Sequence, residues 1–207
     1  IISLVNIFYV CGSRSCLIAL PLVLVFVFFK IYGTKKLPQI LLSMFVLCSV
    51  AGLTSTTLQQ RVTQAFSEQQ HYLDGAEITS VGIRMVFYAN TFSLIKERPL
   101  FGYGTSSFEK VYTSYASSHN SGWQATPTGD PHNQYLFILL ENGVLGLLLF
   151  LVYLYFAFKE FDKDQPYTAI ACCVLLTVCI TSLFNSHFKT HSEGYLLAFF
   201  MGVLLSR

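Results

Sequence analysis

Runs of apolar residues close to the length of a membrane-spanning helix divide this chain and limit what it can fold into. The runs are residues 16–29, 37–53, 135–158, 167–184 and 195–205. About 20 apolar residues cross a bilayer, and the shorter runs would take residues from their flanks. Of the 207 residues, 53% are hydrophobic and only 12% are charged, against about 25% charged in ordinary soluble domains. The sequence therefore predicts an all-α integral membrane protein.

The remaining composition excludes several other classes of protein. Five of the six cysteines lie within apolar runs and Cys11 lies at the edge of one, so we expect packing residues and no disulfide framework. The adjacent pair Cys172 and Cys173 lacks zinc-ligand spacing, and we predict no structural metal. A net charge of +2 without a basic cluster gives no reason to expect a nucleic-acid partner. Residues 1–10 are also apolar, without an initiating Met or a basic segment, so we expect the C-terminal part of a longer protein.

The basic residues of the short connections predict which side of the membrane each loop faces. Lysine and arginine near helix ends remain on the cytoplasmic side. The residues that mark this side are Lys30, Lys35, Lys36, Lys159, Lys163 and Arg207. This pattern places Arg14 and the 187–191 turn on the outer face. We expect membrane helices in 1–55 and 132–207 and one large outer loop at 56–131, all belonging to a single membrane domain.

The large outer loop carries its own helical patterns. We expect a short helix at 59–66, a turn near Asp74 and Gly75, and a second helix at 83–96. In the second helix the apolar residues are Val86, Phe87, Ala89, Phe92 and Ile95. They leave Arg84, Tyr88 and Thr91 on a shared polar face, with Arg84 in the first turn, as in a helix that lies along a surface. The Arg98-Pro99 pair ends this helix.

Two short features of the outer loop stay open between a functional and a structural interpretation. Gly102-Tyr103-Gly104 predicts either a plain tight turn or a backbone cradle for phosphate, and the turn is favoured. Tyr112 and Trp123 are expected to be membrane-interface or sugar-facing aromatic residues.

The segment Asp130-Pro131-His132-Asn133 stands where the polar loop meets an apolar run. Asp130 suits the N-cap and Pro131 the first helical position, which would place His132 and Asn133 in the first turn. The helix dipole there disfavours the imidazolium form, so His132 would be neutral and able to accept a proton. The alternative, a histidine that only caps its helix and meets lipid headgroups, fits the position equally well.

Two arginines are expected on the same outer face as His132. Arg14 precedes an apolar run and Arg84 opens the second loop helix. Guanidinium groups bind phosphate oxygens through paired hydrogen bonds, so two of them could neutralise a diphosphate while His132 takes a proton from an attacking hydroxyl. An arginine acting alone would more simply reach headgroup phosphates.

Several short motifs occur in an order that resembles a known family. They are Gly12-Ser13-Arg14, Arg84, the segment RPLFGYG at 98–104, HNQYL at 132–136 and ENGVLG at 141–146. Together they resemble the O-antigen ligase and polymerase superfamily. The resemblance implies a GT-C-type helical bundle with a large helical periplasmic loop, in the bacterial inner membrane. It also implies a metal-independent, inverting glycosyltransferase without a cofactor.

The resemblance further implies substrates and residue roles. The donor would be a glycan on undecaprenyl diphosphate, and the acceptor a lipid A core or a growing polysaccharide. His132 would be the general base, and Arg14 and Arg84 would bind the diphosphate. Arg98 would help to shape the donor site, although an ion pair with Glu97 or Glu109 fits its position equally well.

Alternatives to the ligase remain from two classes. An O-antigen polymerase or a protein O-oligosaccharyltransferase would use the same donor and the same type of base. A membrane transporter component is suggested by Glu141, because a carboxylate inside a membrane helix is often functional, although a structural role for it is at least as plausible. Gly143 and Gly146 would let another helix approach closely.

Overall fold

The computed structural model describes residues 14–73, 78–159 and 165–205, and within these ranges every regular element is a helix. The chain forms two compact units, which are described separately. The first comprises residues 1–67, 161–181 and 200–207, and the second comprises residues 68–160 and 182–199. The apolar segment 1–10 and the turn expected near Asp74 and Gly75 lie outside the described residues.

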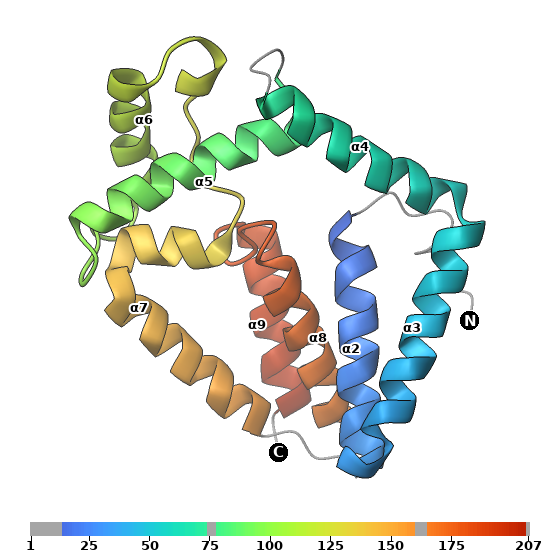
Figure 1. Ribbon diagram of the computed structural model, residues 1–207. Coiled ribbons are helices and arrows are strands. Elements are labelled where there is room, and N and C mark those ends of the chain that lie inside the picture. The colour runs from blue at the N-terminus through green and yellow to red at the C-terminus, as the bar shows by residue number, and fades with distance from the viewer. Residues whose placement is uncertain (1–13, 74–77, 160–164, 206–207) are drawn as a thin grey trace. The chain divides into compact units, whose positions relative to one another are not determined.

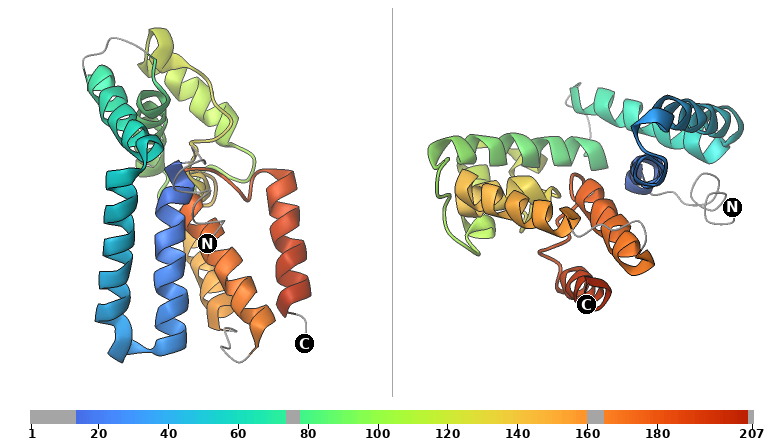
Figure 2. Two further views of the ribbon diagram at one scale, coloured as in Figure 1. Left: turned by 90° about the vertical axis from the view of Figure 1, so that its right-hand side faces the viewer. Right: turned by 90° about the horizontal axis from the view of Figure 1, so that it is seen from below.

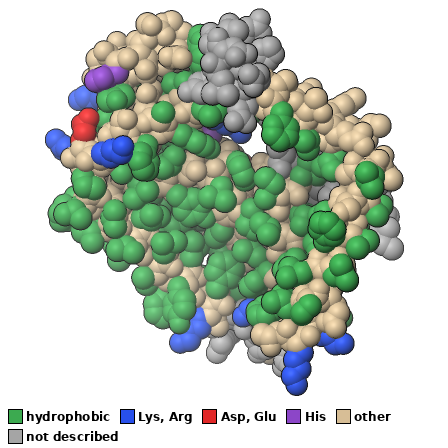
Figure 3. Space-filling view, in the orientation of Figure 1, with side chains coloured by type: hydrophobic (Ala, Val, Ile, Leu, Met, Phe, Trp, Pro, Cys, Tyr) green, Lys and Arg blue, Asp and Glu red, His purple; other side chains and the backbone are tan. Residues whose placement is uncertain are grey.

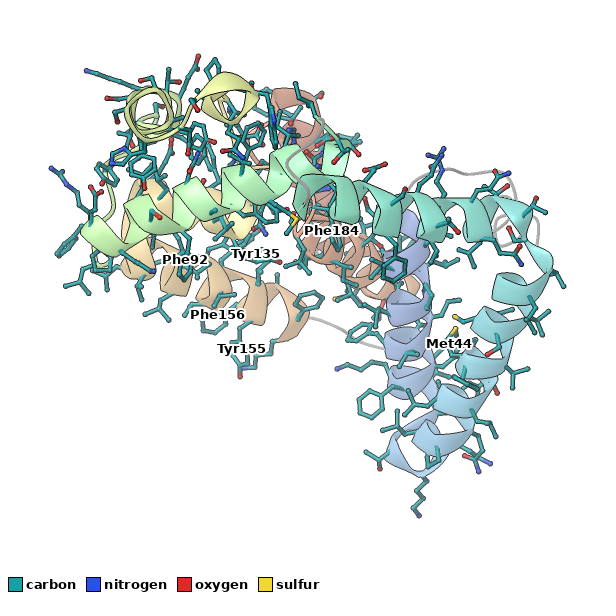
Figure 4. The ribbon with its side chains drawn as sticks, turned by 45° about the horizontal axis from the view of Figure 1, so that its top comes forward. Met44, Phe92, Tyr135, Tyr155, Phe156 and Phe184 are labelled. Atoms are coloured by element: carbon teal, nitrogen blue, oxygen red, sulfur yellow. The ribbon has the colours of Figure 1, made fainter. Side chains whose placement is uncertain are left out.

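The first unit is built on three apolar helices, α2 (Arg14–Tyr32), α3 (Leu37–Thr54) and α8 (Pro166–Thr181). Helices α2 and α3 are connected by the short helix η2 (Thr34–Lys36) and run side by side (Figure 2). Helix α2 packs against both α3 and α8. Met44 of α3 is buried and lies on the side of α3 that faces α2 (Figure 4).

Helix α4 (Thr56–Leu73) is polar and belongs to the first unit as far as Ser67. Its first turn is capped by Ser55, whose buried hydroxyl oxygen accepts the N–H of Leu58 at 3.1 Å. The helix expected at 59–66 is confirmed. It begins earlier, at Thr56, because the cap lies at Ser55, and it continues to Leu73.

The second unit packs α5 (Ser80–Glu97) against α6 (Phe108–His119) and α7 (Gln134–Lys159). It also contains η3 (Gly122–Ala125) and most of α9 (His191–Leu205). Buried aromatic rings join the three main helices. The ring of Phe108 stacks on Tyr112 at 5.7 Å and on Phe137 at 5.3 Å, and Phe87 meets Tyr112 edge-on at 5.7 Å.

Two expectations for the outer loop are wrong at Tyr112 and Thr91. Tyr112 is fully buried in the aromatic core, where its hydroxyl accepts a hydrogen bond from Asn90 at 3.0 Å, so it cannot face a sugar or a membrane. Thr91 is also fully buried and does not share a face with Arg84 and Tyr88, which are half-buried. The cause is α6, a helix that the sequence analysis did not predict and that covers this side of α5.

Helix α7 bends at Gly143, which has φ 64° and ψ −167°, and the bend is visible in Figure 1. The loop after α5 docks onto this bend. The N–H groups of Tyr103 and Gly104 are donated to the carbonyls of Leu140 and Glu141 at 2.9 and 2.8 Å. The expected plain turn is confirmed, and because these N–H groups are occupied they cannot cradle a phosphate.

Glu141 is buried beside the same bend, and its carboxyl oxygen Oε1 accepts the N–H of Phe108 at 3.2 Å. Phe108 is the first residue of α6, so the carboxyl group satisfies one of the otherwise unpaired N–H groups of that helix. This contact gives Glu141 a structural role and removes the main observation that favoured a transporter component.

Two helical segments of the described chain, Thr34–Thr54 and Gln134–Lys159, are long and apolar enough to cross a membrane by length and composition. In each segment, only 17% of the most apolar 18-residue window is buried by protein, which argues against core helices of a soluble domain. Figure 3 shows hydrophobic side chains gathered over α7, whereas charged side chains lie over α6 and the end of α5. Tyr155 and Phe156 project from the last turns of α7, and Phe92 from α5 (Figure 4). All five expected apolar runs lie largely within helices, of which α8 and α9 have only 16 and 15 residues.

Candidate active site

His132 lies immediately before α7, in a left-handed backbone conformation with φ 54°. The predicted cap at Asp130 is wrong. Asn133 caps the helix instead, because its side-chain Oδ1 accepts the N–H groups of Tyr135 and Leu136 at 3.0 and 3.1 Å. His132 therefore stands outside the first turn, with its side chain 38% exposed. A non-glycine residue with positive φ is uncommon and is often found at functional sites.

Asp130 holds this conformation in place. Its Oδ1 accepts the backbone N–H of His132 at 2.7 Å and the hydroxyl of Ser186 at 3.2 Å. The same oxygen lies 3.6 Å from Nδ1 of His132, and Oδ2 lies 3.9 Å from Nζ of Lys189. A carboxylate on the Nδ1 side favours a proton on that nitrogen, which leaves Nε2 of the neutral ring as the acceptor.

The ring of His132 also has an aromatic neighbour. It stacks on Phe87 of α5 at 6.1 Å with an angle of 27° between the ring planes. Phe87 is buried in the core of the second unit, so the ring orientation is tied to the packing of α5. A ring held on one side by a carboxylate and on one face by a buried phenyl group is preorganised for proton transfer.

The segment 182–190, which connects α8 to α9, lies against the start of α7. The N–H of buried Gln134 is donated to the carbonyl of Ser182 at 2.9 Å, and its Oε1 accepts the N–H of Phe188 at 2.9 Å. The amide of Asn133 is donated to the carbonyl of Leu183 at 3.1 Å. These contacts join segments about 50 residues apart in the chain and hold the residues next to His132 in place.

Arg84 is connected to His132 through Tyr88, one helical turn further along α5. The hydroxyl of Tyr88 lies 3.2 Å from the carbonyl of His132 and 3.3 Å from that of Leu183, and donates to them. Burial raises the pKa of Tyr88, while the Arg84 cation and a hydrogen bond with Asn133 lower it. Arg84 is in the second turn rather than the first, because Thr79 caps α5 by accepting the N–H of Gly82.

The other two predicted arginines lie elsewhere. Arg98 is exposed at the far end of α5, where its guanidinium group stacks over the Tyr103 ring at 4.9 Å. Fourteen helical residues separate it from Arg84, or about 20 Å along the axis. Arg14 is the first residue of α2 in the first unit, and its side chain lies outside the described residues. Among the described side chains of the three arginines, Arg84 is the one whose charge affects a residue of the His132 turn's surroundings, Tyr88.

Sequence reasoning missed several polar residues of this site. Tyr88 was placed on the face of Arg84, and its spacing of four residues was a usable signal. Ser186 and Lys189 had no such signal, because they reach Asp130 only through tertiary folding. In the same segment, His187 contacts the Glu193 carboxylate at 2.7 Å through Nδ1. The side chain of His191 is not described.

Comparison with known proteins assigns the chain to a family. The family model for O-antigen ligase matches residues 1–151, a range that contains Arg14, Arg84 and His132. The chain belongs to the O-antigen ligase family. An uncharacterised protein of Haemophilus influenzae is 26% identical over 200 residues, which cover 91% of this chain and 50% of that protein.

Two further relatives of the chain are named putative polysaccharide ligase. The protein of Rickettsia felis is 38% identical over 80 residues, covering 37% of this chain and 19% of the relative. The protein of Rickettsia conorii is 27% identical over 149 residues, covering 68% of this chain and 36% of the relative. The chain thus spans half or less of the length of these proteins.

Proposed function

We propose that this protein transfers a glycan from undecaprenyl diphosphate to a lipid A core acceptor, at the periplasmic face of the bacterial inner membrane. The family assignment and the ligase names of the two Rickettsia relatives support this proposal. In the proposed topology, segments 1–55 and 132–207 belong to a GT-C-type membrane bundle, and segment 56–131 is the periplasmic loop. The exposed apolar surface of α7 supports a lipid partner for that helix.

The proposed reaction is a single inverting displacement that needs no metal. The oxygen of an acceptor hydroxyl attacks the anomeric carbon of the donor sugar, and Nε2 of His132 takes the hydroxyl proton. As the new bond forms, the bond between the anomeric carbon and the diphosphate oxygen breaks, and undecaprenyl diphosphate leaves with the electron pair. Asp130 is a positioning residue, because its carboxylate faces Nδ1 and fixes the turn that carries the ring.

Cationic groups in this proposal bind the diphosphate and stabilise its developing charge. Arg84 is the best supported, because it precedes Tyr88 by one helical turn, its charge lowers the pKa of Tyr88, and the Tyr88 hydroxyl contacts the His132 carbonyl. Arg14 keeps the role that the family resemblance implies. Arg98 lies beside Tyr103 at the other end of α5, which favours a contact with the glycan part of a substrate over one with the diphosphate.

The observation that carries the proposal is the connected set Asp130, His132, Tyr88 and Arg84 at the entrance of α7. This set supports a proton acceptor at His132 and an anion-binding cation at Arg84 acting on the same substrate. We would express the gene in a Gram-negative host that lacks its own O-antigen ligase and examine surface polysaccharide on gels.

The variants for this test are His132→Gln and Arg84→Ala, with Arg61→Ala as a matched control for loss of an arginine. Arg61 lies on the polar helix α4, where it contacts only Gln64 among the described hydrogen bonds. We expect wild type and Arg61→Ala to restore lipid A-linked glycan, and the other two to fail at equal membrane expression. Full restoration of the glycan by His132→Gln would refute the assignment of His132 as the general base. If wild type instead lengthens glycan chains in a polymerase-deficient host, the protein is a polymerase.

A further inference from the structure

A groove separate from the His132 turn lies between the second half of α5, the turn at 103–107 and α6. Its volume is about 590 Å³. Leu94 and Val111 are its least exposed apolar members, whereas Glu97, Lys110 and Ser114 are exposed along its edge. The groove is therefore apolar at its base and polar at its rim, the arrangement of a small-molecule site in which a few polar groups provide orientation.

Two tyrosine rings in the groove are held in fixed orientations. The hydroxyl of Tyr103 is donated to Oε2 of Glu97 at 2.6 Å, and Arg98 stacks over its ring at 4.9 Å. The ring of Tyr115 stacks on His119 at 4.1 Å, with 12° between the planes. Rigid aromatic side chains supply contact area at low entropic cost, which suits a binding site more than a freely solvated surface.

The mixture of groups indicates the chemical class of the ligand. Glu97 accepts hydrogen bonds, Lys110 donates them, and the hydroxyls of Ser114 and Ser118 do both. The charges of Glu97 and Lys110 offset each other in the lining, and the Arg98 guanidinium is engaged with the Tyr103 ring, so the lining has no marked preference for a phosphate or a nucleic acid. A ligand with many hydroxyl groups and apolar C–H faces satisfies both the polar rim and the aromatic rings, and saccharides have this character.

We propose that the groove binds a saccharide chain of the transferase substrate, a proposal that rests on the glycan transfer proposed above. Phe87, which stacks on His132, and Leu94 of the groove lie seven residues apart on α5, or about 10 Å along the axis. A glycan of a few sugar units spans that distance. Binding remote from the reacting atoms helps to orient a substrate and raises the rate at the reacting centre.

The test measures binding of two soluble oligosaccharides to the purified protein in lipid nanodiscs. One probe is core oligosaccharide freed of lipid A, and the other is the repeat-unit oligosaccharide released from its lipid carrier. We expect wild type to bind at least one probe. Tyr115→Leu and Lys110→Ala should raise its Kd by about tenfold, the loss expected for one ring or charged contact.

The control is Lys96→Ala, an exposed lysine of α5 that stacks over Phe92 outside the groove and should leave binding unchanged. Binding of the core probe alone identifies the acceptor glycan, and binding of the repeat-unit probe alone identifies the donor glycan. No binding of either probe, or equal Kd for wild type and the two groove variants, overturns the proposal. Because Lys110 is exposed, that variant keeps the test valid if Tyr115→Leu fails to fold.

Different results would refute the groove proposal and the glycan-transfer proposal. If the groove proposal alone is wrong, glycan transfer in the ligase-deficient host persists while neither oligosaccharide binds. If glycan transfer is wrong, wild type yields no lipid A-linked product whatever the binding assay gives.

Discussion

Replacing Gly143 by alanine should destabilise the second unit more than any other glycine-to-alanine change considered below. Gly143 has φ 64° and ψ −167°, a region that is essentially restricted to glycine, and an added Cβ would overlap the backbone of Leu100. The overlap would push away the loop whose carbonyls accept the N–H groups of Val144 and Leu145 at 2.8 and 3.3 Å.

Three effects contribute to the expected loss. Backbone strain costs about 1–3 kcal/mol, overpacking about 1–3 kcal/mol, and each weakened hydrogen bond about 1 kcal/mol. The total of about 4–8 kcal/mol is a large part of the 5–15 kcal/mol by which a typical domain is stable. For a chain of this size it lowers the midpoint of thermal unfolding by roughly 10 °C or more.

Two further glycines separate strain from overlap. Gly104 has φ 102° but open space around an added Cβ, so Gly104→Ala should cost only the strain of about 1–3 kcal/mol. Gly202 lies in α9 with neither a positive φ nor a neighbour within 4 Å, so alanine should gain about 0.5–1 kcal/mol. The assay is size-exclusion chromatography of detergent-solubilised protein after stepwise heating. Equal heat resistance of Gly143→Ala and Gly202→Ala would refute the reasoning.

Three other predictions concern the site, the groove and the metal requirement. Asp130→Asn keeps an oxygen that accepts the His132 N–H but removes the charge facing Nδ1, so the rate of transfer should fall by roughly tenfold with an unchanged KM. Asp130→Ala should also lower thermal stability. Equal transfer rates for wild type and Asp130→Asn would remove Asp130 from the mechanism. Burial and the Glu97 carboxylate raise the pKa of Tyr103 from 10.0 to about 12, so the contribution of this pair to stability is complete below pH 10 and is lost as the pH rises towards 12. Glu97→Gln should lower that pKa, as measured by ultraviolet titration of each protein against its Tyr103→Phe variant, and an unchanged titration would contradict the contact. Transfer should persist in EDTA with added metals omitted, and its loss with recovery on metal addition would exclude the metal-independent reaction.

The helices of the apolar runs could be predicted from sequence, because an uninterrupted apolar segment has few alternatives to a helix in a membrane. The limits expected for residues 37–53 differ from those of α3 by one residue, and those expected for 135–158 differ from α7 by one at each end. Helix α6 was not predicted, because a third of its residues are Ser or Thr and its stability comes from packing Phe108 and Tyr112 on α5.

The candidate site was only partly predictable. The sequence selects His132 by its place at the end of the loop, and its role as a base stays a prediction. Its backbone conformation could not be predicted, because Asp and Asn are both good caps and the helix is capped by Asn133. The contacts from Ser186 and Gln134 join segments about 50 residues apart and depend on how α8 and α9 are connected. The structural role of Glu141 was weighed from sequence, yet its partner, the N–H of Phe108, belongs to the helix that was missed.

The most direct test of the central claim is glycan transfer by the purified protein in nanodiscs, with a lipid diphosphate-linked glycan as donor and lipid A core as acceptor. We would compare single-turnover rates of wild type, His132→Gln and the control Arg61→Ala. General base catalysis by His132 predicts a loss of about 10²–10⁴-fold for His132→Gln and no loss for Arg61→Ala. Equal rates for wild type and His132→Gln would contradict the account.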